Sequence, residues 1–143
     1  MKAKNVILIP VVTDEGNHHK FVLAQDFQVK LAIEIKGYYK FYHAGNLWGT
    51  LCDGVLTIKR GYAWNGCSFV PDTKKTLAAG LIHDFMYQFA CGDVAWNRAQ
   101  ADETFYIQLS QERFIAAKLY YIGVHSMGWA FYGKEKETTY DKA

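Results

Sequence analysis

The hydrophobic pattern of this sequence changes its period once, at about residue 73. Before that point apolar and polar residues alternate, most clearly along residues 28–35, and such alternation predicts strands with one buried face. After it, apolar residues recur three and four positions apart, which predicts helices. Strands followed by helices are typical of the α+β class. We therefore expect an N-terminal antiparallel β-sheet followed by about three C-terminal α-helices.

The same patterns give approximate bounds for each element. We expect strands at 5–12, 20–25, 28–35, 38–43 and 55–59, with a turn at 44–46. We expect helices from about 73 to 89, from 94 or 96 to 110, and from 111 to 132, the last with one apolar side formed by Phe114, Ile115, Leu119, Ile122 and Trp129. Residues 1–132 are expected to form a single domain, and residues 133–143 a polar, loosely ordered tail.

Length and charge limit the classes of function. A chain of 143 residues can bury a core without cross-links. A net charge of +2, with no run of Lys or Arg longer than two, does not favour a nucleic-acid partner. We interpret residues 6–12 as a strand and not as a signal peptide, and no apolar stretch approaches the roughly 20 residues of a transmembrane segment.

Cysteine and aromatic residues add two further expectations. Cys52, Cys67 and Cys91 are odd in number and lack CxxC spacing, so we expect neither a zinc site nor a disulfide framework, and a reduced intracellular protein is the simpler interpretation. Aromatic residues make up 16% of the chain. Such residues are enriched in cores, in protein interfaces and at lipid boundaries, and composition does not choose among these.

One polar cluster interrupts the apolar turns of the first expected helix. It follows a loop rich in glycine and small polar residues, Gly61–Asp72, and consists of His83, Asp84 and Tyr87. His83 and Tyr87 are four residues apart and therefore share a helix face, whereas Asp84 lies about 100° round from His83. We regard this cluster as the candidate functional site.

A carboxylate on the next expected helix is the predicted partner of His83. Arg98, Asp102, Phe105 and Leu109 fall on one stripe, so Asp102 stands on a largely apolar face. The short connection between the helices favours antiparallel packing, and we therefore expect Asp102 to meet His83. An imidazole held by a carboxylate is a general base that can activate water.

Asp84 is predicted to serve a different purpose. Its direction away from His83 suggests a ligand for a hard cation, with calcium as the candidate. The remaining ligands would be backbone carbonyls of the preceding loop, at Trp64, Gly66 and Ser68. Such a cation could polarise a carbonyl group and stabilise an oxyanion.

The order of motifs from Gly61 to Trp129 resembles that of a known family. The chain contains GYAWNGCS, then PD, then IHDFMY and then NRAQAD. This order is similar to that of the short phage and bacterial proteins designated DUF1353, a domain of unknown function. The resemblance implies a phage or prophage source, and hence a virion or host-cytoplasm location, but it implies no mechanism.

A second resemblance concerns chemistry. His83-Asp84-x-x-Tyr87, with Asp102 on the following helix, resembles the antiparallel helix pair of secreted phospholipases A2. The resemblance implies that His83 is the water-activating base and that Asp102 orients its imidazole. It also implies that Asp84 binds calcium, that Tyr87 is a hydrogen-bonding support, and that the substrate is a lipid or another ester. Gly80 stands where that family has a disulfide-bonded cysteine.

Other interpretations of the same residues remain open. His83 could be a buried histidine that fixes helix packing through Asp102, and Arg98 with Asp102 could be a simple ion pair within one helix. In that case the protein would be a non-enzymatic virion component or a host-interaction protein with a structural polar network.

Two further enzyme classes are weaker alternatives. Gly66-Cys67-Ser68 is similar to the nucleophile segment of papain-like peptidases, but Pro71 follows closely and would interrupt a helix that carries the thiol. Phosphohydrolases with a metal-bound His-Asp pair need additional helical histidines, and the expected helices offer only His125 for this purpose.

Overall fold

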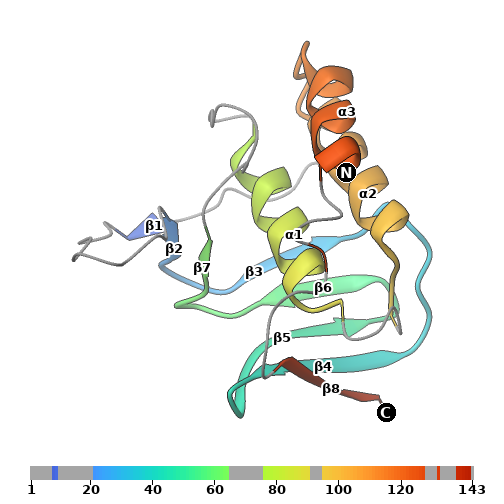
Figure 1. Cartoon of the computed structure of the whole chain (residues 1–143). Coiled ribbons are helices and arrows are strands. Elements are labelled where there is room, and N and C mark those ends of the chain that lie inside the picture. The colour runs from blue at the N-terminus through green and yellow to red at the C-terminus, as the bar shows by residue number, and fades with distance from the viewer. Residues whose placement is uncertain are drawn as a thin grey trace.

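The computed structural model describes residues 8–9, 21–64, 76–90, 95–127, 132 and 138–142. Within these residues strands fill most of the N-terminal part and three helices follow, so the predicted α+β class is confirmed. The helices lie on one side of the larger sheet, with α1 (Leu77–Gln88) nearest to it and α3 (Ala117–Met127) farthest away (Figure 1).

The larger sheet of the described residues has five antiparallel strands in the order β3-β6-β5-β4-β8. Its members are β3 (Phe27–Lys30), β6 (Val55–Ile58), β5 (Asn46–Cys52), β4 (Tyr38–His43) and β8 (Thr138–Lys142). Strands β4, β5 and β6 follow one another as hairpins. Their turns place Ala44 (φ 48°) and Asp53 (φ 45°) in the left-handed region, each followed by a glycine with positive φ. Two successive left-handed residues suit a two-residue hairpin turn.

A smaller sheet leads the chain to the site. It consists of β1 (Leu8–Ile9), β2 (Phe21–Leu23) and β7 (Ala63–Trp64), in the order β1-β2-β7. The residues after Trp64, up to 75, lie outside the described part of the chain. The predicted start of the first helix near residue 73 therefore falls partly outside the described residues, and the helix is seen from Leu77 onward.

The strand prediction at 28–35 was correct about burial and wrong about length. Residues at odd positions point inward, and Val29, Leu31 and Ile35 are all buried. Pairing with β6 nevertheless ends at Lys30, and the Leu31 amide then donates to the Gly54 carbonyl at 2.8 Å. The alternating pattern thus continues beyond the ladder because burial, and not strand pairing, sets it.

Helix α1 packs its aromatic side chains directly on the larger sheet. Phe85 and Phe89 contact Phe41 of β4 edge to face, with ring centroids 5.8 and 6.0 Å apart. Gly49 of β5 makes room for this contact, because a Cβ atom there would lie 2.4 Å from Cζ of Phe85. These contacts fix the distance between α1 and the sheet, and hence the position of the polar residues on the other side of α1.

The second and third helices begin later than predicted. Helix α2 runs over Arg98–Gln111, although residue 94 or 96 was the expected start, because Asn97 caps the helix at that point. Helix α3 begins at Ala117 and not at 111, and Arg113, with a φ of 55°, lies in the intervening turn. The left-handed residue ends the helical path before a new one starts.

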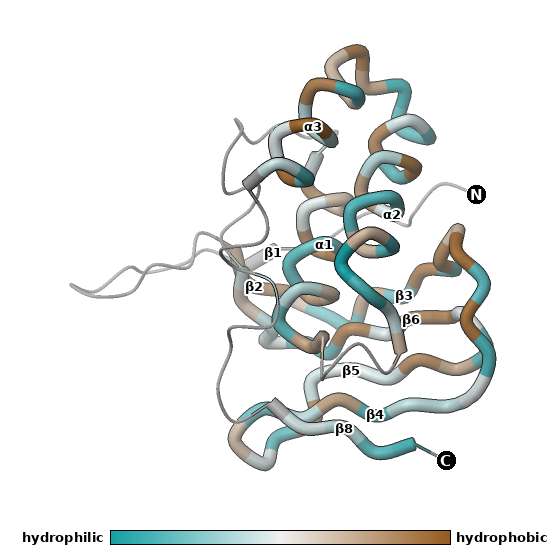
Figure 2. The backbone as a smooth tube through the Cα atoms, turned by 45° about the vertical axis from the view of Figure 1, so that its right-hand side comes forward, coloured by the Kyte–Doolittle hydropathy of each residue, from teal (hydrophilic) through white to brown (hydrophobic). Residues whose placement is uncertain are grey.

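The apolar side predicted for the third helix is not the side that the helix buries. Ile115, Leu119 and Ile122 are exposed, with 101%, 71% and 49% of their surface accessible, and Trp129 lies outside the described residues. Among the described side chains of α3, the buried ones are Ala117, Tyr120 and Val124, which pack with Phe105 and Leu109 of α2. Figure 2 shows hydrophobic residues, in brown, on α3, which lies away from the larger sheet.

The expected loose tail contains an ordered segment. Residues Thr138–Lys142 form β8, which pairs antiparallel with β4 along the sheet edge (Figure 1). Main-chain pairing places this polar segment, because its described side chains are exposed. In the part of the chain that is described, none of the helices has the length and apolar character that a membrane crossing requires.

Candidate functional site

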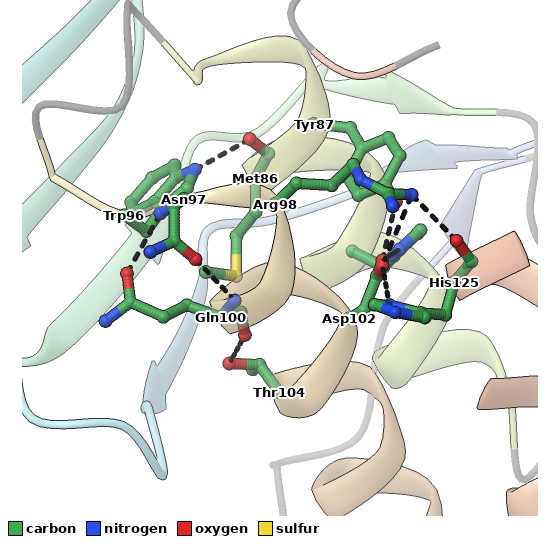
Figure 3. A network of polar contacts seen from close by, with 10 residues as sticks. Met86, Tyr87, Trp96, Asn97, Arg98, Gln100, Asp102, Thr104 and His125 are labelled. Atoms are coloured by element: carbon green, nitrogen blue, oxygen red, sulfur yellow. Dashed lines mark hydrogen bonds and ion pairs between the residues drawn. The ribbon is translucent and has the colours of Figure 1, made fainter. Parts of the chain in front are cut away.

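The start of helix α2 is fixed by a capping box and, just before it, by a hydrogen bond to α1. The side chain of Asn97 accepts from the amide of Gln100 at 2.9 Å, while the Gln100 side chain accepts from the amide of Asn97 at 2.9 Å. This capping box satisfies two amides that a helix start otherwise leaves unpaired. Next to it, Nε1 of Trp96 donates to the carbonyl of Met86 at 2.7 Å (Figure 3). The register of α2 along α1 is thereby set.

The predicted meeting of His83 and Asp102 is present. Helices α1 and α2 run in opposite directions (Figure 1). Nε2 of His83 lies 2.8 Å from Oδ1 of Asp102, and the hydroxyl of Tyr87 donates to the same oxygen at 2.5 Å. His83 and Tyr87, one turn apart on α1, thus both bind one oxygen of a carboxylate on α2.

The second oxygen of Asp102 belongs to other partners. Nδ1 of His125, on α3, lies 3.1 Å from Oδ2. Nη1 of Arg98 is 3.8 Å from Oδ2 and donates to the main-chain carbonyl of His125 at 2.8 Å (Figure 3). Asp102 is therefore the centre of a network that joins all three helices.

Burial makes this network energetically significant. Asp102 has no exposed surface, and His83 and Tyr87 retain 8% and 7% of theirs. Burial by itself raises the pKa of the Asp102 carboxyl, but the hydrogen bonds from His83 and Tyr87 outweigh it, so the pKa lies below its usual value. The carboxylate is therefore ionised at neutral pH and acts only as an acceptor.

The state of Asp102 decides the tautomer of His83. Because an ionised carboxylate cannot donate, Nε2 of His83 must carry the proton, which leaves the lone pair on Nδ1. Burial lowers the pKa of His83, and the Asp102 charge opposes this only in part, so the ring is neutral at neutral pH. Burial and the Asp102 hydrogen bond both raise the pKa of Tyr87, which keeps its hydroxyl protonated as a donor.

Two aromatic rings contact the His83 imidazole. The Tyr87 ring lies 4.1 Å from it and the Phe105 ring 4.9 Å, both measured between centroids. Phe85, Phe89 and Trp96 instead belong to the core between α1 and the sheet. Among the described residues, the rings that contact the His83 imidazole are therefore those of Tyr87 and Phe105.

The predicted cation ligands are only partly described. Asp84 lies on α1 and is half-buried, and Trp64 ends β7 with 2% of its surface exposed. Gly66 and Ser68 lie outside the described residues. Among the residues that are described, no group of three or more His, Cys, Asp or Glu side chains is arranged to hold a metal ion. The described part of the predicted site thus contributes one carboxylate, at Asp84.

Two members of the network were not predicted as site residues. Arg98 was considered only as part of an alternative, a simple ion pair with Asp102 four residues later, and it also donates to the main-chain carbonyl of His125. His125 was considered only as a metal ligand in an alternative enzyme class. The sequence feature that could have predicted these contacts is the place of Asp102 on the second of three helices, because its two oxygens can there face different neighbouring helices.

The cysteines and the sequence comparisons add little to this geometry. Cys52 is exposed with a free thiol, and Cys67 and Cys91 lie outside the described residues. Comparisons with protein-family models, curated proteins and solved structures found no match.

The fold and the site together define an α+β domain whose helices share a buried His/Asp/Tyr network. Chemically, this network can hold a neutral imidazole in one tautomer beside a fixed negative charge.

Proposed function

We propose that this chain hydrolyses an ester bond, with His83 as general base and Asp102 as the carboxylate that orients its imidazole. The observation that carries the proposal is the direction of the His83 ring. Nε2 is bound to Asp102, whereas Nδ1 has no hydrogen-bond partner among the described residues. A fixed imidazole with an available lone pair is what a general base needs.

The reaction follows from this arrangement. Nδ1 of His83 takes a proton from a water molecule while the water oxygen adds to the ester carbonyl carbon. The imidazolium that forms is stabilised by the Asp102 charge at 2.8 Å. The tetrahedral intermediate then collapses, the carbon–oxygen bond to the alcohol breaks, and the alkoxide takes the proton back from Nδ1. The products are a carboxylic acid and an alcohol.

The likeness to phospholipases A2 supports a lipid ester as the substrate class. In that resemblance the base and its support stand one turn apart on one helix, and the orienting carboxylate comes from the next. Here His83 and Tyr87 both contact Asp102 in that way. The likeness to DUF1353 proteins adds a phage or prophage source to the proposal.

The experiment that tests the hydrolase compares variants on two probes. The probes are p-nitrophenyl butyrate and mixed phosphatidylcholine/phosphatidylglycerol vesicles, each assayed with and without added calcium. We expect turnover by the wild type, and His83→Ala should lower it by at least about 100-fold. Glu103→Gln, an exposed change next to Asp102 on α2, is the matched control and should leave turnover unchanged. Equal turnover by the wild type and His83→Ala would refute the proposed base.

Calcium is a separate part of the proposal. Asp84 would supply the carboxylate, and the backbone carbonyls of Trp64, Gly66 and Ser68 the remaining protein ligands. Calcium bound there would polarise the ester carbonyl. One described carboxylate does not by itself make a calcium site, and the proton transfers of the proposed reaction need only His83 and Asp102. Calorimetry of calcium binding to the wild type and to Asp84→Asn tests this part: heat that disappears in the variant supports it, and no heat with the wild type contradicts it.

One observation favours a second candidate function. His83 is only 8% exposed, which suits a histidine whose task is to hold α1 and α2 together. The protein would then be a virion component or a host-interaction protein without catalytic activity. Absence of turnover on both probes, combined with a large loss of stability in His83→Ala, would favour this function.

A further inference from the structure

Different helices hold the two oxygens of Asp102. Oδ1 accepts from His83 and Tyr87, which both lie on α1. Oδ2 faces His125 of α3 and Arg98 of α2. Within the described residues, the partners of this carboxylate are therefore divided between the candidate base on one side and α3 on the other.

Among the described residues, one contact at Oδ2 has the geometry of a hydrogen bond. The distance of 3.1 Å from Nδ1 of His125 is within the range for a nitrogen donor, whereas the 3.8 Å from Nη1 of Arg98 is beyond it. Arg98 thus contributes charge at Oδ2 without fixing its direction. His125 is the residue in the described part of the chain that directs this oxygen.

The position of His125 is itself well supported. Nη1 of Arg98 donates to its main-chain carbonyl, and the ring of Tyr121, one turn earlier on α3, stacks on its imidazole with centroids 5.4 Å apart and an interplanar angle of 16°. Its side chain remains 46% exposed. His125 is therefore held in place on one side while its outer edge faces solvent.

We propose that His125 is a positioning residue, whose Nδ1 hydrogen bond fixes the plane of the Asp102 carboxylate and thereby the tautomer of His83. The effect of His125 on catalysis rests on the proposed hydrolase, whereas its effect on the His83 tautomer does not. The carboxylate torsion of aspartate is broad, so two donors on Oδ1 alone leave the plane free to turn. A third donor on Oδ2 removes that freedom. The docking of α3 thus controls the orientation of His83 through Asp102, although among the described residues His83 has no hydrogen bond to α3.

Two polar substitutions at His125 test this inference. The amide nitrogen of asparagine occupies about the position of Nδ1, whereas that of glutamine reaches about the position of Nε2. His125→Asn therefore keeps a donor for Oδ2, and His125→Gln displaces it. Because the side chain is almost half exposed, both variants are expected to fold, and urea unfolding checks this. His43→Gln on β4 serves as a control for a histidine outside the helices.

The first readout needs no substrate. Nitrogen-15 chemical shifts of the His83 ring, recorded at one near-neutral pH, report which nitrogen carries the proton. We expect the Nε2–H tautomer in the wild type, in His125→Asn and in His43→Gln, and a mixture of tautomers in His125→Gln. A wild-type His83 spectrum in His125→Gln would overturn the proposal.

The second readout separates this inference from the proposed function. If the chain is a hydrolase, His125→Gln should lower kcat by up to about 100-fold with little change in KM, and His125→Asn should restore most of it. An equal loss of kcat in both variants would overturn the positioning role while leaving the hydrolase intact. A tautomer mixture in His125→Gln, in a protein without turnover on either probe, would refute the hydrolase and support the positioning of His83 by His125.

Discussion

Replacement of the Asp102 carboxylate by an amide tests how much its charge contributes to folding. Asp102→Asn keeps the shape of the side chain, and its oxygen can still accept from His83 and Tyr87. A hydrogen bond to a charged group contributes about 1.5–3 kcal/mol and a neutral one about 0.5–1.5 kcal/mol. The two bonds together should therefore lose roughly 2–3 kcal/mol.

Two effects reduce this loss. The new amide group would face Nδ1–H of His125, but His125 is half exposed and can exchange its tautomer so that Nδ1 accepts. Removal of a buried charge also removes the cost of its desolvation. The net effect should still be a loss, because the lowered pKa of Asp102 means that the fold favours the ionised form. We expect Asp102→Asn to lower the free energy of unfolding by about 1–2 kcal/mol.

Urea unfolding at neutral pH, followed by tryptophan fluorescence and circular dichroism, measures this change. With a denaturant slope of about 1–3 kcal/mol per molar, the midpoint should fall by roughly 1 M. Glu103→Gln, on the same helix and exposed, should change the stability by no more than about 0.5 kcal/mol. If Asp102→Asn matches that control, or raises the stability, the network does not stabilise the fold through the charge of Asp102.

Three further predictions concern stability. The pKa of His83 is lowered from 6.5, so the unfolded chain binds a proton that the folded protein does not, and the free energy of unfolding should fall as the pH drops below about 6.5. Urea unfolding at several pH values should show a shallower fall for His83→Gln than for the wild type. Equal pH dependence in the two proteins would contradict this. The pKa of Asp102 is lowered from 3.8, so the free energy of unfolding should fall a second time below about that pH. This second fall should be missing in Asp102→Asn, and acid titration followed by circular dichroism measures it. Asn97→Ala removes the capping box of α2 and should cost about 1 kcal/mol in thermal or urea unfolding, whereas an unchanged midpoint would mean that the cap contributes little.

Much of the site could be predicted because it depends on local geometry. Helical spacing places His83 and Tyr87 on one face, and a short connection brings the next helix alongside, so the contact with Asp102 follows from the sequence. The strand at Asn46–Cys52 was not predicted, although its two hairpin partners at 38–43 and 55–59 were. Gly49 interrupts the apolar alternation of that strand, although Asp53-Gly54 is a strong turn signal.

The remaining elements depend on contacts that no local pattern records. The turn between α2 and α3 contains neither glycine nor proline, and Arg113 adopts a positive φ that its residue type does not announce. The start of α3 was therefore misplaced, and the contact of His125 with Asp102 was missed. The apolar side expected for this helix is largely exposed. Strand β8 is polar and gains its order from main-chain pairing with β4, which no hydrophobic period can predict.

The close fit of Gly49 under Phe85 also limits how the sequence can vary. A methyl group at position 49 would need the space that the Phe85 ring fills, and its carbon would also lie 3.0 Å from the main-chain oxygen of Thr57. A larger residue at one position therefore requires a smaller residue at the other. Among descendants of this sequence the two positions should change together, so that the pair, and not either residue alone, is the unit on which selection acts.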